Sequence, residues 1–68
     1  MNENWQQRLM EEQKELAVKL LKLDIFLDGK NFAELDEDNQ VLLRQQREAM
    51  KNYCDILLRR IEINNIAI

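Results

Sequence analysis

The chain has 68 residues, with 10 Lys and Arg against 13 Asp and Glu, so that its net charge is −3. A chain of this length forms at most one small domain, and the acidic balance argues against a protein that holds DNA or RNA by its backbone. Histidine is absent and cysteine occurs once, which removes the commonest general base, a Cys-His nucleophile and an internal disulfide. These features predict a single unit over residues 1–68 that is not an enzyme and holds no metal or cofactor.

A first helix is predicted over about residues 4–28. Its leucines recur at the spacing of one face of an amphipathic helix. They are Leu9, Leu16, Leu20, Leu23 and Leu27. Trp5 continues this stripe toward the helix start, and Gly29, the one glycine of the chain, follows its end. We expect Gly29 to end the helix in the left-handed conformation.

We expect residues 29–36 to form a compact connector, in which Phe32 and Leu35 turn inward to close one end of a hairpin. Asp36 is the best N-cap for a second helix over about residues 37–63. The stripe expected to face the first helix is Leu42, Leu43, Ala49, Met50, Tyr53, Leu57 and Ile61. Two helices of similar length joined by a short connector predict an all-α fold, an antiparallel two-helix hairpin.

Further apolar residues lie outside these stripes and predict self-association. They are Val18, Leu21, Ile25, Phe26, Ile56, Leu58, Ile63, Ile66 and Ile68. A lone hairpin has a thin core, so we expect a compact homo-oligomer in which these side chains are covered. No apolar run reaches the roughly 20 residues that cross a bilayer, and no signal peptide opens the chain. A cytosolic protein with no membrane partner fits best, with Cys54 as a buried small hydrophobe.

Three cations have no acidic residue three or four positions away: Lys22, Arg47 and Arg60. Such side chains either lie along apolar surface with the charge in water, or pair with an acid of another protomer. Alternatively, they are kept for an anion such as a phosphate. In a symmetric oligomer, a two-fold axis would repeat Lys22 twice and a three-fold axis would repeat Arg60 three times. Trp5 likewise has two interpretations, as the end of the core stripe or as a surface on which a base stacks.

Three patterns carry a resemblance to a known family. They are "EL..K..KL..FL" from Glu15 to Leu27, "F..L" from Phe32 to Leu35, and "LL..Q..AM..Y..IL..RI" from Leu42 to Ile61. With these patterns, residues 8–61 resemble the helical hairpin of the phage cyclic-oligonucleotide sponges, the type 2 anti-CBASS proteins. The type 1 anti-Thoeris proteins share this hairpin.

The resemblance implies a homohexamer, a trimer of dimers, in the cytoplasm of an infected bacterium. Such sponges bind cyclic dinucleotides at dimer contacts and cyclic trinucleotides on three-fold axes. They sequester these immune signals without cleaving them, so the defence effector stays silent. The expected partners are therefore cyclic oligonucleotides and further copies of the chain, and not DNA or RNA.

The resemblance also assigns residues by position. Lys22 matches the lysine that binds phosphate in the dinucleotide pocket, and Trp5 is the candidate for the aromatic that stacks on a base there. Asp24 departs from the family, which often has a small hydroxyl residue at this place; a carboxylate can instead accept a hydrogen bond from a base or ribose hydroxyl. Arg60 matches the arginine of the trinucleotide site, with Asn64 as its companion.

A second function class remains open. An oligomeric helical hairpin can dock on another protein through a helix groove and hold no small ligand. Lys22 and Arg60 discriminate the two functions, because a docking module tolerates glutamine at either position. A helix-turn-helix DNA reader is remote, since that motif needs short helices and a basic recognition face.

Overall fold

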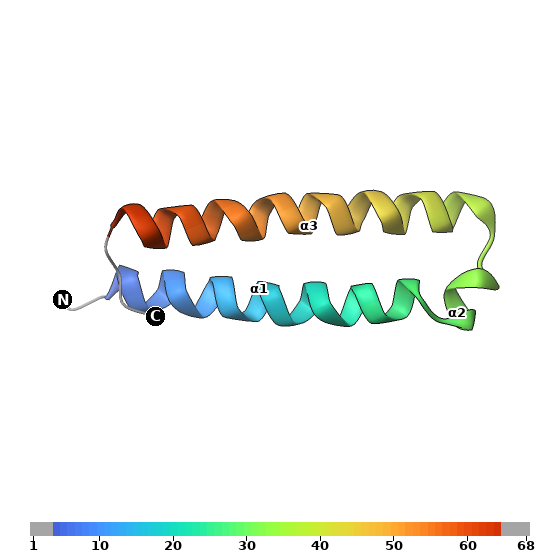
Figure 1. Cartoon of the computed structure of the whole chain (residues 1–68), viewed down its shortest axis with the longest axis horizontal. Coiled ribbons are helices and arrows are strands. Elements are labelled where there is room, and N and C mark those ends of the chain that lie inside the picture. Colours follow the sequence, from blue (N-terminus) through green and yellow to red (C-terminus); the bar gives the residue numbers. More distant parts are fainter. Residues whose placement is uncertain (1–3, 65–68) are drawn as a thin grey trace.

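The computed structural model describes residues 4–64, which form two long helices and one short one (Figure 1). Helix α1 is Trp5–Leu27, α2 is Lys30–Ala33 and α3 is Glu37–Ile63. The predicted all-α hairpin is confirmed, and the helices expected at about 4–28 and 37–63 correspond to α1 and α3. The connector differs in one respect from the expectation, because it contains the single helical turn of α2.

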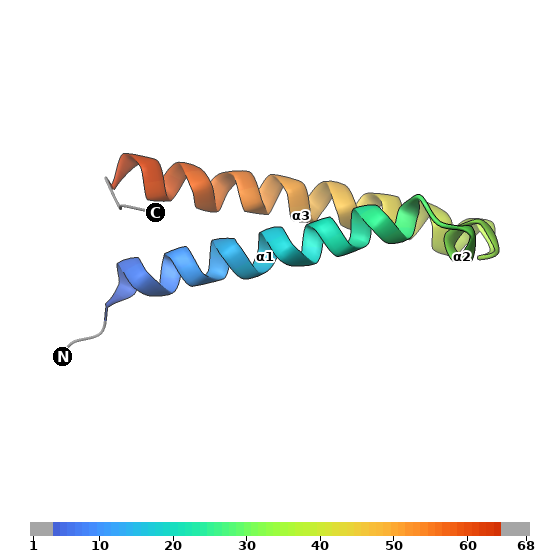
Figure 2. The same cartoon turned by 60° about the horizontal axis from the view of Figure 1, so that its bottom comes forward.

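The two long helices run antiparallel along an elongated molecule that measures 48 × 19 × 15 Å. Figures 1 and 2 both show α1 and α3 side by side over their lengths, with α2 at one end. The start of α1 therefore lies beside the end of α3, and we call this the open end of the hairpin.

The buried core is small and lies at the open end. Leu9, Leu57 and Ile61 form one cluster with exposed fractions of 4%, 0% and 1%, and Met10 and Leu16 pack against it. Along the rest of the predicted α1 stripe, Leu20, Leu23 and Leu27 are only partly buried. Within residues 4–64 no polar or charged residue is buried. The hairpin thus has little core of its own beyond one tight contact between its helix ends.

Cys54 is buried in α3, as expected for a small hydrophobe. Its Sγ accepts a hydrogen bond of 3.5 Å from Nε2 of Gln13 on α1. This contact links the two helices about two turns along α3 from the core residue Ile61.

Three residues of the predicted α3 stripe are exposed and not buried against α1. Leu42 is 60% exposed, Tyr53 is 45% exposed, and Ala49 is also exposed. Each residue of an α-helix is rotated by about 100° from the one before. The residues that follow Leu42 and Tyr53, which are Leu43 and Cys54, are the ones turned toward α1. The three exposed residues therefore lie to one side of the buried stripe.

The end of α1 differs from the prediction for Gly29. This residue is extended, with φ −97° and ψ 168°. The prediction of a left-handed conformation is therefore wrong. The amide of Asp28 donates to the carbonyl of Ile25 at 3.2 Å, and that of Gly29 to the carbonyl of Phe26 at 3.1 Å. These tight final turns satisfy the last carbonyls of the helix without a left-handed residue. Gly29 is then free to precede α2 as its N-cap.

Phe32 closes the connector end of the hairpin. Its side chain is 5% exposed, its ring meets Phe26 edge-to-face with centroids 6.3 Å apart, and the guanidinium of Arg44 lies 4.9 Å from its ring centre. Nε2 of Gln40 donates to the carbonyls of Phe32 and Leu35, both at 3.1 Å. The inward turn of Phe32 is confirmed, while Leu35 is partly buried.

Asp36 occupies the predicted N-cap position of α3, although its carboxylate makes no cap bond to the helix backbone. Instead, Nδ2 of Asn39 donates to Oδ1 of Asp36 at 2.6 Å. This side-chain hydrogen bond is the largest cause that lowers the pKa of Asp36 from its ordinary value. At the other end, Asn4 caps α1, since its Oδ1 accepts from the amide of Gln7 at 3.1 Å.

The core predicts a large difference between two adjacent leucines. Leu57→Ala should lower the free energy of unfolding by about 2–5 kcal/mol, because it leaves a cavity in the tightest contact. Leu58→Ala should cost less than half as much, since Leu58 is only partly buried. Urea unfolding followed by circular dichroism at one protein concentration measures both; equal losses would contradict the assigned core.

Candidate functional site

A hollow of about 240 Å³ at the open end brings α1 and α3 together. It is lined by Trp5, Arg8, Leu9, Glu12 and Arg60. The four α1 residues follow at three- and four-residue spacings, which place them on one face of the helix. Arg60 comes from the last turn of α3. Leu9 is part of the buried core, so it forms an apolar floor beneath polar walls. We call this the terminal hollow.

Charged groups surround the terminal hollow. The hydroxyl of Tyr53 donates to the carboxylate of Glu12. This hydrogen bond is the main cause that raises the pKa of Tyr53, and the positive charge of Arg60 acts in the opposite direction. Arg60 is therefore close enough to the Tyr53–Glu12 pair to act on it. No hydrogen bond or ion pair within residues 4–64 engages the guanidinium of Arg60 itself, so its charge is available to the hollow.

Asn64, the expected companion of Arg60, lies one helical turn after it at the end of α3. It is the C-cap residue. Its Nδ2 donates to the carbonyl of Arg60 at 2.8 Å. The side chain of Asn64 thus closes the helix end, and this closure fixes the backbone on which Arg60 sits.

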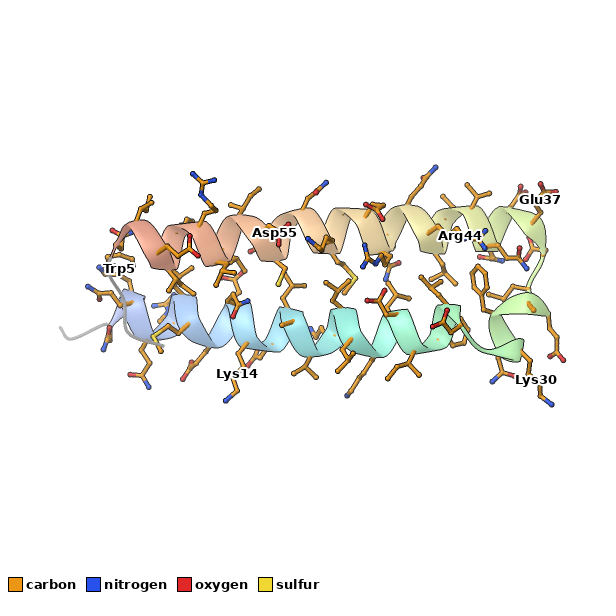
Figure 3. The ribbon with its side chains drawn as sticks, viewed as in Figure 1. Trp5, Lys14, Lys30, Glu37, Arg44 and Asp55 are labelled. Atoms are coloured by element: carbon orange, nitrogen blue, oxygen red, sulfur yellow. The ribbon has the colours of Figure 1, made fainter. Side chains whose placement is uncertain are left out.

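Lys22 lies elsewhere, on the face of α1 turned away from α3. A shallow hollow of about 330 Å³ is lined by Lys14, Glu15, Val18, Lys19 and Lys22. Figure 3 shows Lys14 pointing away from α3. Three lysines against one glutamate make this patch positive. Lys22 has neither a hydrogen bond nor an ion pair among the described residues, as its sequence neighbours indicated.

Exposed apolar side chains accompany this basic patch. Val18, Leu21 and Ile25 are 47%, 60% and 64% exposed. They follow at spacings of three and four residues and so form one stripe beside Lys22. An apolar stripe next to a cluster of lysines on an otherwise solvated helix indicates a contact surface.

Asp24 is held on the inner face by Arg47. Nε of Arg47 lies 2.8 Å from Oδ1 of Asp24, and Arg47 also pairs with Glu48 at 3.2 Å. The hydrogen bond to Asp24 is the largest cause that raises the pKa of Arg47. Arg47, which has no acidic residue three or four positions away in the sequence, therefore has its acidic partner on the other helix. Counting neighbours along one helix missed it, because the partner belongs to the other helix.

The residues assigned to a dinucleotide site are not together in one chain. Lys22 and Asp24 are two positions apart and so point about 200° apart around α1. Trp5 lies 17 positions before Lys22, which separates them by roughly 25 Å along the helix axis. The structure instead groups Trp5 with Arg60, which the sequence analysis had placed in different sites. Glu12 and Arg8 were missed as members of this group, although their spacing from Trp5 was visible.

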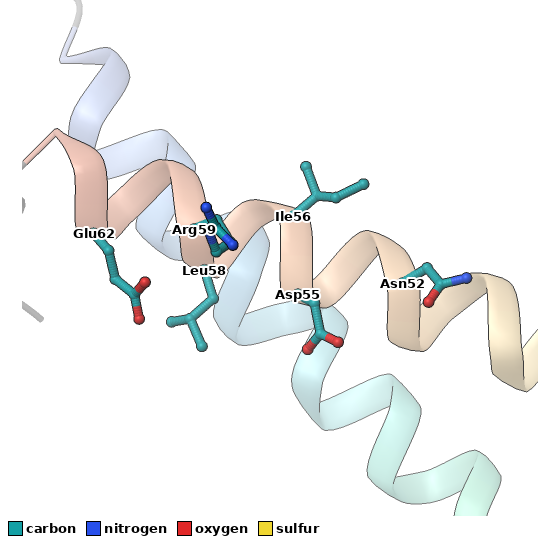
Figure 4. Close-up of a pocket in the computed structure, with 6 residues that line it drawn as sticks. All are labelled: Asn52, Asp55, Ile56, Leu58, Arg59 and Glu62. Atoms are coloured by element: carbon teal, nitrogen blue, oxygen red, sulfur yellow. The ribbon is translucent and has the colours of Figure 1, made fainter.

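A larger hollow, of about 700 Å³, lies along the exposed side of α3 and was not predicted. It is lined by Asn52, Asp55, Ile56, Leu58, Arg59 and Glu62. In Figure 4 the side chains of Asp55, Leu58 and Glu62 project to the same side of the helix. Ile56, which lines this hollow, is 56% exposed. The seven-residue spacing of Leu42, Ala49, Ile56 and Ile63 marks one exposed side of α3, and Ile56 is the member of this set that lines the hollow.

Two other site classes were searched for in residues 4–64. No set of three His, Cys, Asp or Glu side chains there is arranged to hold a metal ion. None of the helices in this range combines the length and apolar character needed to span a bilayer.

A family model, Sequestin, matches residues 3–63. The chain belongs to the Sequestin family. Sequestin is the family of phage cyclic-oligonucleotide sponges, so the resemblance seen in the sequence is confirmed. Searches of the curated proteins and of the solved structures found no match. The Sequestin match covers α1, the connector and α3, and therefore includes the terminal hollow and the basic patch around Lys22.

The Tyr53–Glu12 contact makes a prediction that can be read directly, because Tyr53 is the one tyrosine of the chain. Its phenolate absorbance should titrate with a midpoint above 10.0. Glu12→Gln should move this midpoint down toward 10.0, since the charged acceptor is lost. The contact stabilises the fold fully at pH values below the pKa of Tyr53 in the unfolded chain. This stabilisation is lost as the pH rises through the raised pKa of Tyr53 in the folded chain.

Glu11→Gln is the matched control for this titration, because Glu11 precedes Glu12 and receives its hydrogen bond from Gln7 instead. Its midpoint should equal that of the wild type. An equal shift in both variants would contradict a specific contact between Glu12 and Tyr53.

Proposed function

We propose that this Sequestin-family protein is a phage sponge that sequesters cyclic di- or trinucleotide immune signals and so blocks CBASS-type effectors. The observation that carries the proposal is the family match over residues 3–63. Capture without cleavage needs cations for phosphates and flat or apolar surfaces for bases. The basic patch around Lys22 and the terminal hollow around Arg60 supply both kinds of group.

The Lys22 patch supports a dinucleotide site that a second copy completes. Leu21 and Ile25 are mostly exposed beside Lys22, and packing them against a second copy around a two-fold axis would bring two Lys22 side chains together. Two cations match the two phosphates of a cyclic dinucleotide. The carboxylate of Asp24, which would repel a phosphate, is neutralised by Arg47 on the inner face.

The remaining assignments rest on the family resemblance and on where these residues lie in the hairpin. Because Trp5 is far along α1 from Lys22 of its own chain, a contribution of Trp5 to a Lys22 site would have to come from another protomer. Arg60 and Asn64 lie together at the end of α3. We assign them to a trinucleotide site, where a three-fold axis would place three arginines around three phosphates.

The alternative function is an oligomeric hairpin that binds a protein and no small molecule. The large hollow on α3 favours it, because Ile56 and Leu58 offer an apolar surface next to Asp55 and Arg59. A groove of this kind accepts a helix whose apolar face covers it. The two functions differ in whether the cations matter.

Calorimetric titration with cyclic di- and trinucleotides, with mass in solution recorded on the same sample, tests the sponge. The wild type should bind a panel member, and the ligand should be recovered uncleaved. Lys22→Gln should weaken dinucleotide binding about tenfold or more, since a charge-assisted hydrogen bond contributes roughly 1.5–3 kcal/mol.

Lys30→Gln is the matched control, because Lys30 is exposed at the far end of the hairpin and lines neither cationic hollow (Figure 3). It should bind as the wild type does. If no member of the panel gives a heat of binding, the sponge function is rejected in favour of the docking module.

Self-association is the second prediction of this function. Leu21→Glu and Ile56→Glu each place a charge on one exposed apolar stripe and should lower the mass measured by analytical ultracentrifugation. Gln6→Glu adds the same charge at an exposed position on α1 outside both stripes and should leave the mass unchanged. A wild type that sediments as a monomer would contradict the oligomer.

A further inference from the structure

The terminal hollow joins two residues that the family resemblance places in separate sites. Trp5 opens α1 and Arg60 lies in the last turn of α3, yet both line one depression. Their proximity follows from the core beneath them, because Leu9 packs against Leu57 and Ile61. The same contact that holds the helix ends together therefore sets the distance between the indole and the guanidinium.

The walls of the terminal hollow match the parts of a nucleotide. The indole of Trp5 is 46% exposed, so a flat aromatic surface remains open above the apolar floor. A nucleobase stacks well on such a surface, and stacking tolerates any base. The guanidinium of Arg60, unengaged by residues 4–64, can hold a phosphate with two parallel hydrogen bonds.

Charge favours an anion at Arg60 in spite of the acidic chain. The guanidinium of Arg60 lines the hollow, and residues 4–64 leave it without a hydrogen bond or ion pair, while the chain as a whole carries −3. The carboxylate of Glu12 lines the same hollow, but it already accepts the hydroxyl of Tyr53, which ties it toward α3. Arg60 is therefore the group that an anion in the hollow would meet.

Size limits what the hollow can take. Its volume of about 240 Å³ lies below the roughly 300–1,000 Å³ of pockets that enclose a whole drug-sized ligand. One nucleotide unit of a larger ring suits it better than an entire cyclic oligonucleotide.

We propose that the terminal hollow binds one nucleotide unit of the sequestered ligand, with its base on Trp5 and its phosphate on Arg60. This proposal rests on the sponge function and adds to it that Trp5 and Arg60 serve one site. Glu12 faces the base or ribose as an acceptor, and Tyr53 is a positioning residue that fixes Glu12.

Trp5 makes the test direct, because it is the one tryptophan of the chain. Full-length protein is titrated with cyclic di-AMP, cyclic di-GMP, cyclic GMP-AMP and cyclic tri-AMP, and indole fluorescence and heat are recorded in parallel. The ligand that gives heat should also quench the fluorescence of Trp5, with the same midpoint. Trp5→Leu keeps an apolar side chain but no flat ring and should weaken that binding about tenfold by calorimetry.

Arg60→Gln and Arg59→Gln form the matched pair. They remove the same charge from adjacent positions, but Arg59 lines the large α3 hollow and not the terminal one. Arg60→Gln should weaken binding about tenfold and reduce its salt dependence, while Arg59→Gln should stay within about twofold of the wild type. Circular dichroism shows whether both variants keep the helical content of the wild type.

The outcomes separate this proposal from the sponge function. Heat without any change in Trp5 fluorescence, or equal affinities in the two arginine variants, would overturn the terminal hollow and leave the sponge standing. Quenching that Arg60→Gln leaves unchanged would show that Trp5 and Arg60 serve different sites, which also overturns it. If no ligand of the panel gives a heat of binding, the sponge function is rejected, and the proposed nucleotide site in the terminal hollow is rejected with it.

Discussion

The structure depends on the contact of Leu9 with Leu57 and Ile61, which joins the start of α1 to the end of α3. Two helices can bury only one face each against the other, so a hairpin has no second layer to enlarge its core. Here most of that burial is concentrated at the open end, and the middle of the α1 stripe is only partly covered. Most of the remaining surface of both helices is therefore exposed.

The distribution of polar contacts follows from this arrangement. Charges on the facing sides of the helices pair across the hairpin, as Arg47 does with Asp24. Cations on the outer or lateral sides lie beyond the reach of acids on the opposite helix, and neither Lys22 nor Arg60 has an ion pair or side-chain hydrogen bond within residues 4–64. An acidic chain can thus present positive sites, because the field at a site is governed by the charges within about a Debye length of 8–10 Å.

The sequence predicts the fold well because the fold is mostly local. A 3.6-residue period, one glycine and an N-cap aspartate were enough to place α1 and α3 within about one residue at each end. The side of α3 that faces α1 was predicted less well. Leu42 and Leu43 both fit an apolar stripe, and only the crossing of two real helices decides that Leu43 turns inward.

The candidate site could be predicted only in part for the same reason. The sequence indicated that Lys22 lacks a partner, because no acidic residue lies three or four positions away. The structure agrees, since Lys22 is exposed on α1. The Asp24–Arg47 pair and the grouping of Trp5 with Arg60 join residues 23 and 55 positions apart, and no local spacing contains such contacts. What sequence patterns assign to separate sites, the packing of the helix ends can bring together.

This coupling has a consequence for how the site is held. The terminal hollow has no loop of its own: Trp5 and Glu12 project from one helix and Arg60 from the other. Groups on packed helices keep their relative positions better than groups on loops, and a preformed site loses less freedom when a ligand binds. In the proposed site, the small core at the open end therefore serves stability and recognition at once, because the side chains that it buries are the floor on which the candidate ligand-binding groups are arranged.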